Sequence, residues 1–97
     1  AEVELLLAAI PGVKDALVAG VPDPQGMLTD VPWIFVVPHS PERWSVREFM
    51  AHARARLPSH MVPRNVVVVP AIAMTPSGKP DRRETVRRHG PGAGGAA

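Results

Sequence analysis

The chain has 97 residues, of which 45% are hydrophobic and 21% charged, with a formal net charge of +2 and no cysteine. This length allows one small domain with a modest core and is too short for a deep, enclosed active site. Without cysteine there is neither a disulfide framework nor a thiolate metal site, and no apolar run approaches the roughly 18 residues of a membrane span, so no membrane partner is expected. Because the sequence shows neither a signal segment nor cysteine, we expect a cytoplasmic protein.

The first part of the chain predicts one helix and two strands. Residues 2–10 carry apolar side chains with the spacing of an amphipathic helix, which a Pro-Gly pair ends. Residues 13–21 are rich in valine and alanine and stop at a dense turn signal, residues 22–26, which predicts a strand. Residues 33–37 form a continuous apolar and aromatic run, as expected of a strand buried on both faces. The expected helix stripe consists of Val3, Leu6, Leu7 and Ile10.

A second helix is predicted after Ser45. Ser45 and Glu48 match a capping box, in which the serine hydroxyl accepts from the Glu48 amide and the glutamate reaches back to the serine amide. The helix is expected to end at Pro58. Its apolar stripe consists of Val46, Phe49, Met50, Ala53 and Leu57.

The last elements are a strand and a short helix. Residues 64–69 contain four consecutive valines, which predicts a central strand. Asp81, with Glu84 three residues later, matches another helix cap, so a final helix is expected over residues 82–88. From His89 onward the Gly- and Ala-rich tail has nothing to bury and is expected to be disordered.

The order helix, strand, strand, helix, strand, helix predicts an α+β fold with a small sheet of about three strands covered by helices. We expect residues 1–88 to form one unit and residues 89–97 to be a disordered Gly/Ala tail. The chain begins inside a helix without a cap before Glu2, which we interpret as a cut from a larger protein.

The positive charge is concentrated in the final helix, at Arg82, Arg83, Arg87 and Arg88. Nucleic-acid surfaces usually combine a basic stripe with stacking aromatic side chains. The aromatic residues of this chain fall in apolar patterns away from these arginines. We therefore expect no nucleic-acid partner, and a solvated helix face for the arginine cluster.

Lys79 is the strongest candidate for chemistry. Gly78 supplies backbone freedom, and Pro76 and Pro80 fix φ on either side, so the turn is expected to hold the lysine out from the domain. A lysine ammonium is a compact charge suited to phosphate or carboxylate oxygens that become more negative during a reaction. A lysine that only decorates a surface turn is the alternative, and spacing alone favours it.

A phosphate-binding P-loop is excluded for the Gly-Lys pair. The motif G-x-x-x-x-G-K-[ST] needs a first glycine where this chain has Ala73 and a hydroxyl where it has Pro80. The backbone amides of this loop are therefore not expected to wrap a nucleotide.

Other polar residues predict no second site. The four histidines, at positions 39, 52, 60 and 89, are scattered, so no metal site is expected. Ser59 and His60 are adjacent in a loop, a poor arrangement for nucleophilic catalysis. Asp81 is interpreted as a helix cap, and Arg82 as a support for the lysine loop, with phosphate contact as the alternative.

Five blocks in order resemble the C-terminal subdomain of the adenylate-forming superfamily, which includes acyl-CoA synthetases, aryl-CoA ligases, luciferases and the adenylation domains of nonribosomal peptide synthetases. The resemblance covers Val3 to Arg88, and its Gly-Lys turn matches the last core motif of the family. It replaces the surface-decoration reading of Lys79. The blocks are Pro11-Gly12-Val13, Val21-Pro22-Asp23, Phe35-Val36-Val37, Leu57 to Pro63 and Thr75 to Arg82.

The resemblance implies a mobile lid on a larger enzyme. An N-terminal adenylation domain, missing here, binds ATP with magnesium and a carboxylic acid, and Lys79 enters that site to bridge carboxylate and α-phosphate oxygens. Gly78 and Ser77 belong to the loop that presents the lysine. The acyl-adenylate then passes to CoA or to the phosphopantetheine of a carrier protein, and the 97-residue chain alone is expected to be inactive.

A non-catalytic alternative remains open at this stage. A lid-like domain can be retained as an interaction module that docks a carrier protein or another partner. The sequence also leaves open which acid is activated, whether CoA or a carrier protein accepts it, and the oligomeric state.

Overall fold

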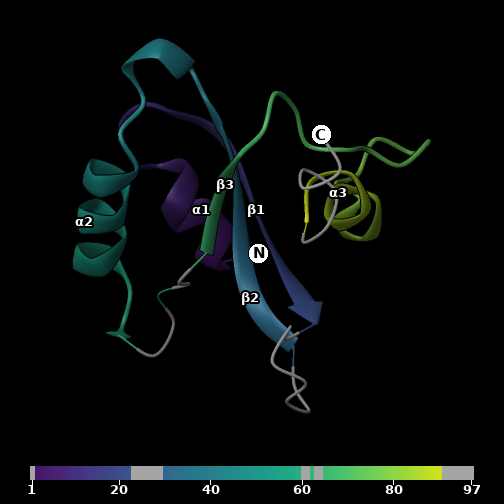
Figure 1. Ribbon diagram of the computed structural model, residues 1–97, viewed down its shortest axis with the longest axis horizontal. Helices are drawn as coiled ribbons and strands as arrows, with labels where there is room; N and C mark the ends of the chain where they lie inside the picture. Colours follow the sequence, from purple (N-terminus) through teal and green to yellow (C-terminus); the bar gives the residue numbers. More distant parts are fainter. Residues whose placement is uncertain (1, 23–29, 60–61, 63–64, 91–97) are drawn as a thin grey trace.

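The computed structural model describes residues 2–22, 30–59, 62 and 65–90 (Figure 1). Helices and strands follow the predicted order, with one additional short 3-10 helix, η1, between the second strand and the second helix. The elements are α1 (Glu2–Ala8), β1 (Val13–Pro22), β2 (Asp30–Pro38), η1 (Pro41–Arg43), α2 (Val46–Arg56), β3 (Asn65–Val68) and α3 (Arg82–His89). The predicted α+β class is confirmed.

The sheet has the order β1-β2-β3, with β1 and β2 antiparallel and β2 and β3 parallel. In the centre of the sheet, Phe35 of β2 pairs with Leu17 on one side and Val67 on the other. Ile34, Phe35 and Val36 are fully buried, so β2 is covered on both faces, as its apolar run predicts.

Helices cover both faces of this sheet. α1 and α2 lie on one face and α3 on the other (Figure 1). Alternate residues of each strand point to opposite faces, so the strands contribute to two separate cores. The first core consists of Leu7, Ile10, Val13, Ala16, Ile34, Val36, Phe49, Ala53 and Leu57. The second consists of Leu17, Ala19, Val21, Phe35, Val37, Val69 and Ile72, with Val86 of α3 packed against it.

The prediction that the valine run forms a central strand is wrong. In the sheet as described, β3 lies at an edge and pairs only with β2. Val68 is 41% exposed, and Val66 and Val67 are only partly buried. Valine favours extended backbone at edges and centres alike, so its abundance predicts a strand but does not give the strand's place in the sheet.

The predicted cap of α2 is observed, but two side chains predicted to be buried on helix stripes are exposed. Ser45 caps α2 as expected, with its Oγ accepting from the Glu48 amide at 3.2 Å, but among the described residues no hydrogen bond returns from the Ser45 amide to Glu48. Leu6 and Val46, both assigned to buried stripes, are 39% and 45% exposed. Leu6 belongs to a helix of only 7 residues, and Val46 is the first residue of α2.

Two sequence predictions fall largely outside the described residues. These are the turn over residues 22–26, of which only Pro22 is described, and the Gly/Ala tail after Gly90. Because α3 continues to His89, the boundary expected at residue 88 lies within a helix, and the division of the chain there stays a prediction. Within the described segments, no helix has the length and apolar character needed to cross a bilayer.

Candidate functional site

Residues 74–80, between β3 and α3, form a hairpin that we call the lysine hairpin. Met74 and Pro80 form an antiparallel bridge. Thr75 N donates to the carbonyl of Lys79 at 2.7 Å, and Gly78 N donates to the carbonyl of Thr75 at 2.9 Å. The hairpin extends from the body of the domain beside α3 (Figure 1).

The turn of the hairpin needs its glycine for conformation. Gly78 has a φ of 85°, a backbone angle that residues with a Cβ rarely adopt. The constraint is conformational, because a Cβ built there would meet no atom within 4 Å. Thr75 Oγ1 accepts from the Lys79 amide at 3.2 Å and lies 3.0 Å from Ser77 Oγ. These contacts close the turn on itself and fix the backbone from which the lysine side chain leaves.

Lys79 is exposed, as the sequence predicts. Its ammonium forms no hydrogen bond or ion pair with any described residue, although its backbone takes part in the turn. The hairpin therefore presents a cation whose charge is not neutralised within the described part of the chain, and this charge is available to an anionic group outside it.

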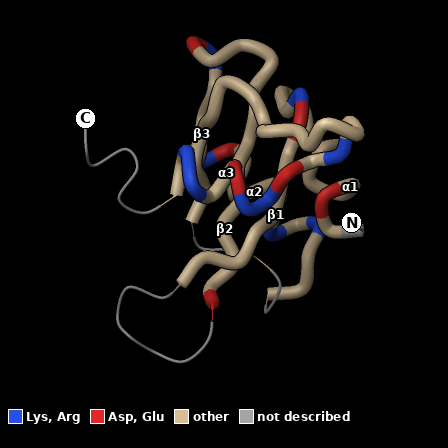
Figure 2. Tube along the Cα trace, turned by 90° about the vertical axis from the view of Figure 1, so that its right-hand side faces the viewer, with Lys and Arg blue, Asp and Glu red and all other residues tan. Residues whose placement is uncertain are grey.

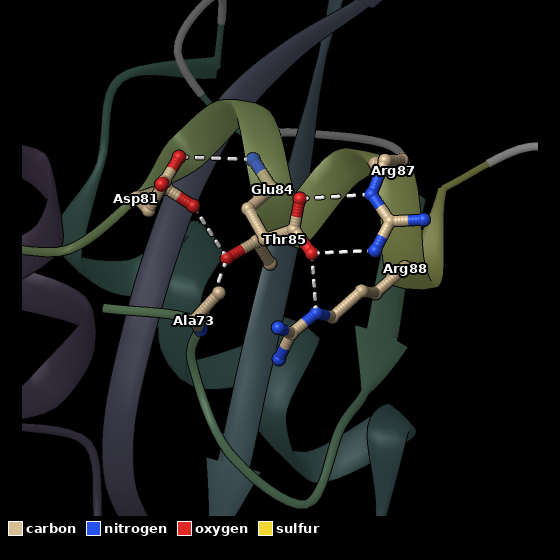
Figure 3. Close-up of polar contacts among 6 residues, drawn as sticks. All are labelled: Ala73, Asp81, Glu84, Thr85, Arg87 and Arg88. Carbon is tan, nitrogen blue, oxygen red and sulfur yellow. Dashed lines mark hydrogen bonds and ion pairs between the residues drawn. The ribbon is translucent and has the colours of Figure 1, made fainter. Parts of the chain in front are cut away.

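The base of the hairpin is joined to α3 by buried polar contacts (Figure 3). Asp81 N donates to the Ala73 carbonyl at 2.8 Å, and Ala73 N donates to Thr85 Oγ1 at 3.2 Å. The Thr85 hydroxyl donates in turn to the Asp81 carbonyl at 2.7 Å. Asp81 Oδ1 accepts from the Glu84 amide at 2.9 Å, which confirms the predicted cap of α3.

Arg82 links α3 to the other side of the domain, and its side chain forms no hydrogen bond with the lysine hairpin among the described residues. Its Nε donates to the Val18 carbonyl at 3.2 Å, and one terminal nitrogen lies 2.8 and 3.0 Å from the carboxylate oxygens of Glu4. The guanidinium thus joins α3 to β1 and α1. Support of the loop, the preferred sequence interpretation, is therefore indirect: Arg82 fixes the helix that follows the hairpin.

Arg87 and Arg88 form a solvated face of α3 with Glu84, and basic and acidic positions lie close together along this helix (Figure 2). Arg87 and Arg88 approach the Glu84 carboxylate at 2.6 and 2.7 Å. The hydrogen bonds from Arg87 and then Arg88 lower the pKa of Glu84 from 4.5 to about 2, and Glu84 raises the pKa of Arg87 in return. The cluster is a surface ion-pair network. The exposure of its arginines matches the predicted solvated helix face.

The C-terminal domain family of AMP-binding enzymes matches residues 2–79, which is most of the chain and ends at Lys79. The chain belongs to this family of adenylate-forming enzymes. The family resemblance of the five sequence blocks is thereby confirmed.

Individual relatives of this chain include CoA ligases and a surfactin synthase subunit. The chain is 41% identical over 83 residues to a medium/long-chain-fatty-acid–CoA/3-oxocholest-4-en-26-oate–CoA ligase of Mycolicibacterium smegmatis, covering 84% of this chain and 14% of that protein. It is 36% identical over 83 residues to surfactin synthase subunit 1 of Bacillus subtilis, covering 86% of this chain and 2% of that protein. The chain thus spans a small part of these relatives.

A solved structure shares the fold of this chain. A fatty acyl CoA synthetase of Mycobacterium tuberculosis superposes with a TM-score of 0.79 over 92% of this chain and 17% of that one, at 24% sequence identity. At that level of identity, the similarity shows the fold alone.

A hollow of about 250 Å³ lies at the start of α2. Its lining includes His39, Glu48 and His52. Within the described ranges, no group of three His, Cys, Asp or Glu side chains is placed to hold a metal ion. His52 Nδ1 lies 3.1 Å from an Arg56 nitrogen on its own helix. The hollow gathers polar side chains without an arrangement that would perform chemistry.

Two threonines of the site were missed by sequence reasoning. Thr75 precedes Lys79 by four residues and bonds its amide, a local pattern that threonine favours in turns and that could have been recognised. Thr85 precedes no motif and gave no such signal, because its bond to Ala73 joins residues 12 positions apart. Placement of Lys79, Gly78 and Ser77 in one exposed turn matches the prediction, while their roles in binding or catalysis stay predictions.

Proposed function

We propose that this domain is the C-terminal lid of an ATP-dependent ligase that adenylates a carboxylic acid and then transfers the acyl group to a thiol. Family membership and the kinds of relatives, CoA ligases and a surfactin synthase subunit, support this proposal. The acid is an acyl, aryl or amino acid, and the thiol belongs to CoA or to the phosphopantetheine of a carrier protein.

The observation that carries the proposal is the exposed ammonium of Lys79 on a braced hairpin. A charge on such a projection can enter a site formed by another domain. There the ammonium would contact oxygens of the substrate carboxylate and of the α-phosphate. Negative charge moves from the attacking carboxylate onto the phosphate oxygens and the leaving pyrophosphate. Charge placed in advance at these oxygens lowers the barrier without transfer of a proton to or from the lysine.

The remaining parts of the active site belong, in this proposal, to an N-terminal adenylation domain. ATP with its magnesium ion would be held mainly by that other domain, and Lys79 would add one cation at the reacting oxygens. On this reading the 97-residue chain alone does not catalyse the reaction.

The second half-reaction requires that the lysine leave. After pyrophosphate is released, rotation of the lid would withdraw Lys79 and bring another face of the domain to the acyl-adenylate, where the thiol attacks. Such a motion gates the two half-reactions. It predicts that the lysine matters in one half-reaction and not in the other.

The test is Lys79→Ala in the complete enzyme, with Lys14→Ala as the matched control. Lys14 is the other lysine of the chain and lies exposed on β1. Loss of one charge at the reacting oxygens is expected to slow acid-dependent pyrophosphate exchange by about 100- to 1,000-fold. Thioester formation from preformed acyl-adenylate should stay near the wild-type rate, and Lys14→Ala should change neither rate.

Equal loss of both half-reactions in Lys79→Ala would reject the assigned role. A screen of the complete, folded protein against a panel of carboxylic acids provides a further check. If no acid supports pyrophosphate exchange, the domain is better explained as an interaction module for a carrier protein or another partner.

A further inference from the structure

The two strands of the lysine hairpin are joined at their base by one backbone hydrogen bond and one side chain, in place of a full backbone pair. In a regular antiparallel pair, two opposed residues donate to each other's carbonyls. Ala73 and Asp81 complete only half of this exchange, because Asp81 N donates to the Ala73 carbonyl at 2.8 Å and the Ala73 amide donates to Thr85 Oγ1. The Thr85 hydroxyl then donates to the Asp81 carbonyl, so it relays the missing bond (Figure 3).

The relay is needed because Asp81 serves two structures. As the cap of α3, its carbonyl accepts the first helical bond from Thr85 N at 3.0 Å, along with the Thr85 hydroxyl at 2.7 Å. These two donors occupy both lone pairs of that oxygen. The Ala73 amide therefore takes the Thr85 hydroxyl as its acceptor in place of the Asp81 carbonyl.

Burial makes the relay hard to replace. Thr85 is fully buried, and it is the only buried polar residue among those described. Ala73 is 7% exposed, so little water can reach its amide. A buried donor without an acceptor is strongly unfavourable, and the backbone must move to satisfy it. The adjacent pair, Met74 and Pro80, offers no compensation, because proline has no amide hydrogen to donate.

We propose that Thr85 is a positioning residue for Lys79, acting through its hydroxyl. The hydroxyl sets the spacing of the two hairpin strands and joins them to α3, and this fixes the direction in which the hairpin projects. The inference rests on the proposed role of Lys79 in adenylation. A charge that must meet reacting oxygens is sensitive to small displacements, so loosening the base of the hairpin reduces catalysis without contact between Thr85 and substrate.

Two substitutions in the complete enzyme separate the hydroxyl from the packing. Thr85→Val keeps the shape and removes the hydroxyl, whereas Thr85→Ser keeps the hydroxyl and removes the methyl. We expect Thr85→Val to slow pyrophosphate exchange by about 10- to 100-fold, with thioester formation from preformed adenylate close to wild type. Thr85→Ser should retain both half-reactions.

Amide hydrogen exchange gives a readout that does not depend on activity. Exchange at the amides of Ala73 and Thr75 should be faster in Thr85→Val than in wild type, and unchanged in Thr85→Ser. A purely packing role for Thr85 predicts the opposite order, with the serine variant the more damaged.

Lys79→Ala, assayed beside these variants, distinguishes the two proposals. If Lys79→Ala leaves pyrophosphate exchange intact, the proposed function fails. If Lys79→Ala abolishes exchange while Thr85→Val behaves as wild type, or Thr85→Ser is as impaired as Thr85→Val, only the positioning role fails. Should Thr85→Val not fold, Thr85→Ser decides: wild-type adenylation and amide exchange support the relay, and loss of either overturns it.

Discussion

Helices α2 and α3 begin with the same kind of cap but are held on the sheet by different interactions. Ser45 and Asp81 each accept from the amide three residues ahead, at 3.2 and 2.9 Å. α2 then buries apolar side chains, Phe49 and Ala53, in the first core. α3 buries only Thr85, with Val86 partly buried against the second core.

Polar contacts take the place of that apolar anchor in α3. Arg82 joins the helix to Glu4 and to the Val18 carbonyl, and Thr85 joins it to Ala73. Apolar contacts are nondirectional and proportional to buried area, whereas hydrogen bonds fix distance and direction. The difference suggests that α2 contributes mainly stability, while α3 contributes the orientation of the hairpin that precedes it.

The largest expected effect tests the apolar side of this comparison. Phe49 is 2% exposed and packs against Trp44, with ring centroids 5.3 Å apart. Phe49→Ala is expected to lower the free energy of unfolding by about 3 to 5 kcal/mol, measured by urea denaturation of the chain. Val86→Ala, a truncation on α3, should cost clearly less, and equal losses would show that α3 is also anchored by apolar packing.

The second prediction compares the two caps. Ser45→Ala and Asp81→Ala should each lower the free energy of unfolding by about 1 kcal/mol, again from urea denaturation. Only Asp81→Ala should also slow pyrophosphate exchange in the complete enzyme, because Asp81 is both the cap of α3 and the last residue of the hairpin base. Asp81→Asn keeps a capping oxygen and is the control for the carboxylate charge. If both alanine variants slowed adenylation equally, the special role of α3 would be refuted.

Local features of this domain were predictable from the sequence. Both caps, the buried strand β2 and the exposed turn at Lys79 depend on residues close in the chain, so short patterns report them. The Gly-Lys turn is specific because Gly78 adopts a positive φ that few residues allow.

Features that join distant segments were not predictable. The edge position of β3 depends on how many strands pair with it, and four valines carry no information about that. The contact between Arg82 and Glu4 joins residues 78 positions apart, and either side chain alone suggests only a surface charge. The relay at Thr85 likewise arises because a helix start and a hairpin base share one residue, Asp81.

The smallest expected effect on stability concerns the glutamate at the third position of each helix, Glu48 in α2 and Glu84 in α3. Glu84 binds Arg87 and Arg88, which lower its pKa to about 2 from the usual 4.5. Because folding lowers this pKa, the ionised carboxylate stabilises the folded chain above about pH 4.5, and the contribution is lost as the pH falls toward about 2. Glu84→Gln should therefore slightly lower the free energy of unfolding at pH 7. The difference from wild type should disappear as the pH falls from about 4.5 to about 2.

Glu48→Gln is the matched control, because Glu48 occupies the same position in α2 and experiences a similar helix dipole. Glu48 forms no ion pair with any residue that the structure describes. Urea denaturation of both variants and wild type, at neutral and acidic pH and at low and high salt, isolates the arginine contacts from the dipole. The difference in the free energy of unfolding between variant and wild type should depend on pH and on salt for Glu84→Gln only. Salt reduces it because exposed ion pairs are screened. If both variants lost the same unfolding free energy with the same pH and salt dependence, the stabilisation would come from the helix dipole and not from the arginines. α2 and α3 would then not differ at this position.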